Sequence, residues 1–222
     1  MPLYTADALV LRTYKLGEAD RIVVFLTRDR GKKRGVAKGA RRQRSRFVGA
    51  LEPLTEVRVA YFESERRELV GLNYAETVRS PLGLGSAGAV VHPDAFGYVG
   101  YFAELLDEWA QEADADDRLY RLGASMLDAL AAGVSVEPLA RYFEYWLLRL
   151  QGVYPESRGT LSNGALTFLS ASRGVPPQQI GDVPADGRVL KELENVHRAL
   201  IAMHLEKTLK SDRVLRDLRR HA

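Results

Sequence analysis

The strongest candidate for a binding function is the stretch from Arg28 to Phe47. It holds ten lysine or arginine residues and one acid, Asp29, between positions 28 and 46, a local charge of +9. Such a cluster binds polyanions, because each cation that contacts a phosphate releases a counterion whatever the base sequence. The alternative is a solvated basic loop, since like charges repel and cannot be buried unpaired. Small and apolar residues interrupt the run, which favours a polyanion-binding surface.

The basic residues of this stretch form two predicted groups. We expect phosphate to be bound first by a cluster in the second half: Lys38, Arg41, Arg42, Arg44 and Arg46. An outer group nearer the start is expected to extend that surface: Arg28, Lys32, Lys33 and Arg34. Three aromatic residues, Tyr14, Phe47 and Tyr61, either offer stacking platforms for bases or belong to the core.

A cofactor site has little support in the sequence. There is no cysteine, which excludes disulfides and thiolate zinc sites. Gly83, Gly85 and Gly88 spell G-x-G-x-x-G, but a dinucleotide site needs this motif to open a helix inside a βαβ unit. Pro93 interrupts such a helix, and no parallel strand follows. We therefore expect no cofactor.

Metal ions and catalysis are equally poorly supported. An EF-hand loop starting at Asp114 would put Arg118 and Leu119 where an oxygen ligand and a glycine are required. Glu194 and His197 form a single Glu-x-x-His pair, whereas a carboxylate-bridged metal site in a helical bundle needs two pairs and further glutamates. No Ser-His-Asp arrangement, nucleophile elbow or P-loop can be assembled. The sequence predicts a protein that is not an enzyme and holds no metal.

The distribution of charge along the chain indicates two regions with different roles. Residues 1–80 contain 17 Lys or Arg against 10 Asp or Glu, a net charge of +7, whereas the remaining residues contain 15 against 19, a net charge of −4. The chain of 222 residues is 46% apolar, enough for one large domain or two modest ones. It has no apolar run of roughly 18 residues and carries Asp7 where a signal peptide has an apolar core, so we expect a cytoplasmic protein.

The basic first region has the pattern of a small β-barrel. Runs rich in β-branched and aromatic residues, separated by turn residues, predict five antiparallel strands: Ala8–Tyr14, Arg21–Thr27, Lys32–Ala40, Leu54–Phe62 and Arg67–Arg79. In the third strand the small residues Gly35, Ala37 and Gly39 share one face, as in a barrel wall, and Val36 and Lys38 lie on the other. Five short strands without a long helix favour a closed five-stranded OB-fold barrel over residues 1–80, whose loops bind oligonucleotides.

The acidic second region is predicted to be helical. Residues 81–88 are rich in glycine and proline, and beyond residue 95 the apolar residues recur every three or four positions. The section from 153 to 184 is irregular, with a short helix at 163–171, and long apolar stripes follow from residue 189 to residue 218. The fold class is therefore α+β: a barrel domain at 1–80 and a helical domain at 81–222.

Three ordered motifs make the chain resemble the RecO family of bacterial DNA-repair and recombination mediators. The motifs are ALVLRTYKLGEADRIVVFLTRDRGK at 8–32, VAKGARRQRSRFVGALEPL at 36–54, and HLEKTLKSDRVLRDL at 204–218. The resemblance implies an OB-fold followed by a helical domain, binding of single- and double-stranded DNA, and annealing of complementary strands. It also implies work with RecR and single-stranded-DNA-binding protein in loading the recombinase RecA, and association with the nucleoid.

The resemblance also raises two questions about the helical region. Many family members carry a four-cysteine zinc module where this chain has the irregular section 153–184, and the cysteines are absent here. A groove near the C-terminus is expected to accept the acidic, apolar-ended tail of a partner, lined by Leu209, Lys210, Arg213 and Leu215. The alternative is that these residues close the core. The chief alternative for the whole protein is an RNA-binding or ribosome-associated OB-fold protein, which the basic barrel supports equally well.

Overall fold

The computed structural model describes residues 2–64, 66–83, 93–155 and 161–221. The chain forms two compact units. The barrel unit comprises Met1–Leu84 and Val99–Leu127, and the helical unit comprises Gly85–Tyr98 and Asp128–Ala222. The domain boundary predicted near residue 80 stays a prediction. The barrel unit also takes in residues 99–127, which include parts of two helices. Gly85 and Gly88 of the G-x-G-x-x-G motif lie outside the described residues.

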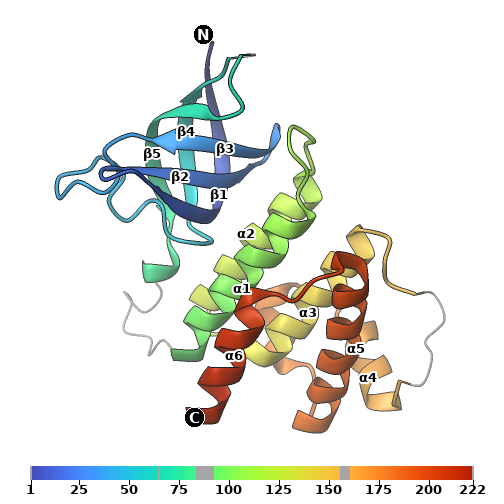
Figure 1. Ribbon diagram of the computed structural model, residues 1–222. Helices are drawn as coiled ribbons and strands as arrows, with labels where there is room; N and C mark the ends of the chain where they lie inside the picture. The colour runs from blue at the N-terminus through green and yellow to red at the C-terminus, as the bar shows by residue number, and fades with distance from the viewer. Residues whose placement is uncertain (1, 65, 84–92, 156–160, 222) are drawn as a thin grey trace. The chain divides into compact units, whose positions relative to one another are not determined.

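Five strands close into a barrel in the order β1-β2-β3-β5-β4 (Figure 1). The strands are β1 Leu3–Leu16, β2 Asp20–Thr27, β3 Gly31–Ala37, β4 Glu56–Phe62 and β5 Val70–Arg79. Four of the five strand pairings are antiparallel, as predicted, whereas the prediction is wrong for the short β3–β5 pairing, which is parallel and closes the barrel. The predicted five-stranded OB-fold barrel is confirmed, although β3 ends at Ala37 and β1 is longer at both ends than expected.

The barrel interior is filled by alternate residues of the strands. Phe25, Val57 and Tyr61 are fully buried there, and Phe47 and Leu51 of the β3–β4 connector close the core. The predicted alternation is confirmed within β3, since Gly35 and Ala37 are buried and Arg34 and Val36 are at least partly exposed. It is wrong for Gly39, which lies with Lys38 in the turn after β3 and is only partly buried. Because strand side chains alternate between faces, Lys32 and Arg34 of β3 face away from the barrel core, whereas Lys33 lies on the side of Gly35 and pairs with Glu63.

The outer face of β1 and β2 is buried as well. Leu9, Leu11, Val24 and Leu26 are at most 4% exposed although they point away from the barrel core. Two helices contribute to the cover: α1, Pro93–Trp109, and α2, Asp117–Ala131. A Cβ at Gly123 of α2 would lie 2.7 Å from Leu9 Cδ1, so glycine lets this helix approach β1 closely.

The α1–α2 connector forms a bridge with the first half of β3. The Lys32 amide donates to the Gln111 carbonyl oxygen at 3.0 Å, and the Ala113 amide donates to the Lys32 carbonyl oxygen at 3.3 Å. Gly31 makes this approach possible: its φ is +67°, and a Cβ there would overlap the Asp114 backbone. The bridge occupies the part of the β3 edge that β5, which pairs only with residues 35–37, leaves open.

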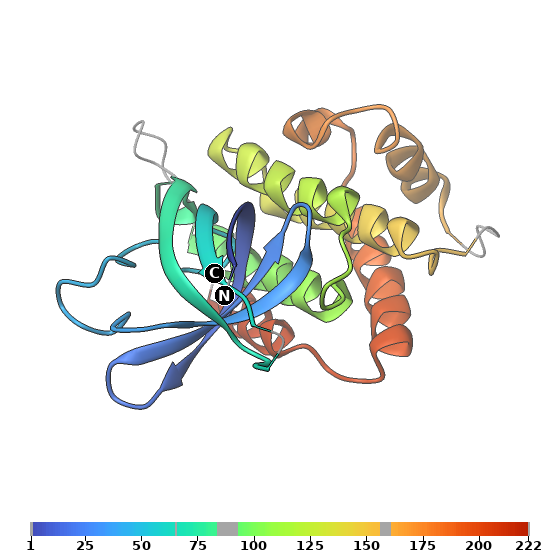
Figure 2. The ribbon, with the colours of Figure 1, turned by 90° about the horizontal axis from the view of Figure 1, so that it is seen from above.

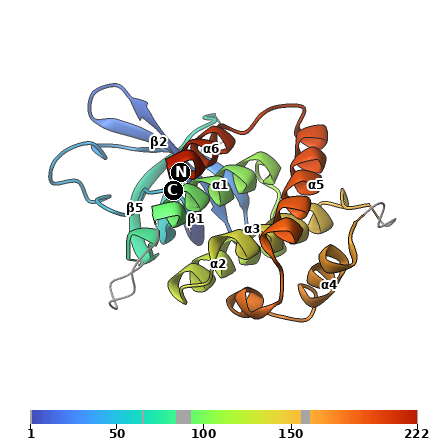
Figure 3. The same cartoon turned by 90° about the horizontal axis from the view of Figure 1, so that it is seen from below.

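The helical unit contains α3 Val136–Leu150, α4 Asn163–Ala171, α5 Gly187–Leu205 and α6 Lys210–His221. The helix expected at 163–171 is confirmed, and a 3-10 helix, Pro177–Asp182, follows it within the irregular section. α5 contacts both α3 and α4 (Figure 3). No helix in the described part of the chain is both long and apolar enough to span a membrane.

Candidate nucleic-acid interface

The β3–β4 connector, which carries most of the predicted phosphate-binding residues, is a series of hydrogen-bonded turns. Its start is tied to the β1–β2 turn: the Gly39 amide donates to Asp20 Oδ1 at 2.8 Å, and the Arg41 amide donates to the Ala19 carbonyl oxygen at 2.9 Å. The Arg41 guanidinium also donates to the carbonyl oxygens of Gly17 and Glu18, at 2.9 and 2.8 Å. The two loops lie side by side in Figure 2. The basic run therefore has a defined conformation.

Four cations of this connector are exposed and available to a ligand. They are Lys38, Arg42, Arg44 and Arg46, which we call the arginine turn. None of the four makes an ion pair with any residue that the structure describes, and Arg46 lies over the Phe47 ring with 5.1 Å between guanidinium carbon and ring centroid. Phe47, 2% exposed, anchors the turn in the barrel core. Exposed cations that make no ion pair in the described structure are available to bind a polyanion.

The outer group of predicted residues is largely neutralised. Arg28 pairs with Asp117 at 2.8 Å, and this hydrogen bond raises the pKa of the guanidinium above its usual value. Lys32 Nζ donates to the Asp107 carbonyl oxygen at 2.6 Å and lies 3.4 Å from Oδ1 of the same residue. Arg34 is exposed.

Lys33 and Arg12 complete the pattern of pairing. Lys33 Nζ lies 2.7 Å from a Glu63 carboxylate oxygen. Arg12 lies between 3.3 and 3.8 Å from the carboxylates of Glu104, Asp107 and Glu108. Burial by itself lowers the pKa of Arg12. The hydrogen bond to Tyr14 and the negative charge of Asp107 raise it by more, so the pKa of Arg12 lies above its usual value. The acids of α1 thus neutralise Arg12 of β1 and Lys32 of β3. Among the described residues no ion pair is seen for the arginine turn or for Arg34, so these cations form a free positive surface.

A groove of about 800 Å³ begins beside the arginine turn. Lys38 and Arg46 line it together with Val36 of β3, the β4–β5 connector and the start of β5. The strand register explains its shape: Val36 pairs with Gly71 and Gly71 pairs with Phe62, so these three residues form a row on the outer face. Gly71 has no side chain, and a Cβ there would meet nothing within 4 Å. The missing side chain leaves a hollow between Val36 and Phe62.

The groove combines apolar walls with positive charge. Phe62, Leu69 and Val70 supply apolar and aromatic surface, while Arg67 joins the two cations of the arginine turn. Glu68 is the only acid among its described lining residues. The groove therefore suits an anionic ligand that also presents flat apolar faces.

The aromatic residues considered for base stacking divide between core and surface. Phe47 and Tyr61 are 2% and 0% exposed and belong to the barrel core, so neither is open to a base. Tyr14 is 43% exposed, and its hydroxyl accepts a hydrogen bond from Arg12. Phe62 is exposed but was not among the residues predicted to stack on bases. The alternation of β4 indicates its position, since a residue next to the inward-facing Tyr61 must face outward.

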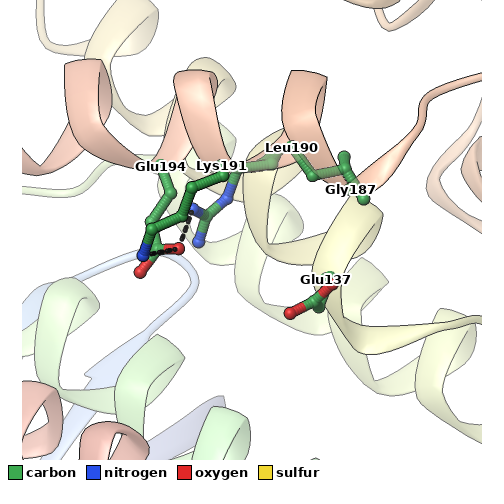
Figure 4. Close-up of a pocket in the computed structure, with 6 residues that line it drawn as sticks. Glu137, Gly187, Leu190, Lys191 and Glu194 are labelled. Carbon is green, nitrogen blue, oxygen red and sulfur yellow. Dashed lines mark hydrogen bonds and ion pairs between the residues drawn. The ribbon is translucent and has the colours of Figure 1, made fainter. Parts of the chain in front are cut away.

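A second pocket, of about 230 Å³, lies in the helical unit between α3 and α5 (Figure 4). Two cations, Arg141 and Lys191, and two acids, Glu137 and Glu194, line it, and Glu194 pairs with both cations. This balance of charge does not suit a polyanion. Three residues beyond Glu194 on α5, His197 Nδ1 lies 3.0 Å from a buried Glu144 carboxylate oxygen.

The Glu194 and His197 pair is therefore engaged with other side chains. No three His, Asp or Glu residues of the described chain are placed to hold a metal ion together. Of the residues predicted to form a partner groove, Leu209 and Leu215 are each 5% exposed, whereas Lys210 and Arg213 are exposed. The groove stays a prediction.

Comparison with known proteins agrees with this architecture. The family model "Recombination protein O N terminal" matches residues 1–81, and "Recombination protein O C terminal" matches residues 92–158. A protein of Nocardioides sp. named DNA repair protein RecO is 36% identical over an alignment of 245 residues, covering 94% of this chain and 97% of the relative. The chain belongs to the RecO family.

Two further relatives with the same name align over shorter segments. The Koribacter versatilis protein is 41% identical over 154 residues, which is 69% of this chain and 61% of the relative. The Anaeromyxobacter sp. (strain K) protein is 38% identical over 148 residues, which is 66% of this chain and 56% of the relative. The chain thus spans about three fifths of the length of these two RecO proteins.

Proposed function

We propose that this chain acts in DNA repair and recombination by binding DNA through the phosphate contacts of the arginine turn and by annealing complementary strands. The observation that supports this most directly is the split between cations: the arginine turn lacks acidic partners in the described structure, whereas Arg28, Lys32 and Lys33 are paired. Phosphate contacts ignore base sequence, so one surface can hold single and double strands.

Annealing follows from the same property. Two complementary strands repel each other through their phosphates, and a surface of exposed arginines screens that repulsion without fixing either strand in one register. By relation to the family, we also propose that the protein works in the cytoplasm at the nucleoid with RecR and single-stranded-DNA-binding protein, and helps to load RecA. No step of this function requires a cofactor or a catalytic residue.

The experiment compares two double variants. Replacing Arg42 and Arg44 by alanine removes two unpaired cations, so the slope of log K against log salt should flatten by about 1.4 for single strands and about 1.8 for duplex. The rate of strand annealing should also be lower for this double variant than for the parent. Arg41 is left in place because it holds the turn against the β1–β2 loop.

The matched control is Arg118→Ala with Arg121→Ala, which removes two exposed arginines from α2 of the same unit. The control should retain the parent slope and annealing rate. Equal slopes for both double variants and the parent would refute the proposed surface. Competition with RNA of the same sequence tests the alternative: preference for RNA without annealing activity would indicate an RNA-binding protein.

A further inference from the structure

We propose that the groove beside the arginine turn binds the bases of an unpaired strand and thereby distinguishes single-stranded from double-stranded DNA. This rests on the proposed function, because Lys38 and Arg46 belong to both the turn and the groove. A strand held at the turn by its phosphates therefore has its bases at the mouth of the groove. Duplex DNA has its bases stacked and paired inside, so it can use the turn only.

The groove floor is built to accept a flat ring. Phe62 is 36% exposed and stands one position across from Gly71, where no side chain fills the outer face of the sheet. Leu3, 51% exposed, pairs with Phe62 on the next strand and continues the apolar row. Aromatic rings on a sheet surface stack on bases of any identity, because every base has a π-face.

The charge around the floor selects the ligand. Three cations, Lys38, Arg46 and Arg67, line the groove with one acid, Glu68, and single-stranded nucleic acid presents both phosphates and flat bases. Its volume of about 800 Å³ falls within the range of roughly 300–1,000 Å³ that is usual for ligand sites. An acidic peptide would satisfy the cations, but it would leave the aromatic floor without a stacking partner.

Two groove variants test this inference, each in the full-length chain. Phe62→Ala removes the stacking ring and should weaken single-strand binding by roughly 5- to 150-fold, the loss expected for one stacked base. Duplex binding should stay within about twofold, and the salt slope for single strands should be unchanged, because no phosphate contact is lost. Gly71→Ile fills the hollow instead, and the open space around its Cβ together with its β-branched side chain suits the strand.

The control is Tyr74→Ala, which removes another exposed aromatic ring from the same barrel but outside the groove. Urea unfolding identifies any variant that fails to fold. If Phe62→Ala does not fold, Gly71→Ile still tests the inference. A selective loss of single-strand affinity in the groove variants, and not in the control, is the expected result.

Two other results would overturn the inference. Equal losses of single- and double-strand affinity would mean that the groove does not discriminate between them. If neither single-strand nor double-strand affinity fell, the groove would not bind DNA and a protein partner would be the remaining ligand. In both cases the proposed function is tested separately by the salt slope of the variant that lacks Arg42 and Arg44, because these two residues do not line the groove.

Discussion

We expect Lys32 to contribute to stability through its contacts with Asp107 rather than to DNA binding, and replacing it by methionine tests this expectation. Methionine keeps most of the length of the side chain and removes the ammonium group. In the folded protein this group donates to the Asp107 carbonyl oxygen at 2.6 Å and lies 3.4 Å from its carboxylate, with the side chain 16% exposed. A hydrogen bond from a charged group is worth roughly 1.5–3 kcal/mol.

The loss should lie near the middle of that range. Asp107 keeps Arg12 at 3.3 Å, so its carboxylate is not left unpaired. We expect Lys32→Met to lower the free energy of unfolding by about 2 kcal/mol and to leave the salt slope of single-strand binding unchanged. The matched variant is Arg42→Met at an exposed cation of the arginine turn, which should flatten the slope by about 0.7. Its stability should stay within about 0.5 kcal/mol of the parent.

The assay pairs urea unfolding with fluorescence anisotropy of a labelled single strand at several salt concentrations. The two variants should show opposite patterns, one losing stability and the other losing salt dependence. A Lys32→Met protein of full stability whose slope has flattened by about 0.7 would refute the reasoning. It would mean that Lys32 leaves Asp107 in solution and binds phosphate as the sequence suggested.

Three further predictions concern other parts of the molecule. Tyr61→Phe should stabilise the protein by about 1 kcal/mol, because the fully buried hydroxyl has no hydrogen-bond partner among the described residues. Burial raises the pKa of Tyr61 to about 12, so the parent protein loses stability as the pH rises from 10 to 12. The urea midpoint should therefore fall less between pH 8 and pH 11 in the variant than in the parent. Gly31→Ala should cost more than about 1 kcal/mol in the same assay, because the methyl group overlaps the Asp114 backbone and φ is positive. Lys210→Glu and Arg213→Glu should each weaken binding of an acidic, apolar-ended peptide titrated by calorimetry; equal affinity of both variants and the parent would contradict a groove there.

The five strands and most of the helices could be predicted from the sequence because their signals are local. Alternation of apolar residues marks the strands, and recurrence every three or four residues marks the helices. The opposite faces of β3 followed from the same period, so Gly35 and Ala37 were placed in the wall and Val36 on the outer face, as observed. The prediction failed for Gly39, because the strand ends at Ala37 and a turn follows.

Residues 8–11 and 22–26 are apolar without alternation, which is typical of strands buried on both faces. In the structure Leu9, Leu11, Val24 and Leu26 are indeed buried behind the barrel wall. The sequence therefore carried a hint that the barrel has a second packed layer, but it could not say which segment supplies that layer.

The sequence by itself determined that a cluster of cations follows the second strand of a small barrel, because composition and strand period are properties of neighbouring residues. Only the tertiary structure decided which of those cations remain free. The acids that neutralise Lys32 and Arg28 lie 75 and 89 residues further along the chain, a separation at which no periodicity links them. The groove depends likewise on the register that aligns Val36, Gly71 and Phe62 across three strands, and register is fixed by folding of the whole barrel.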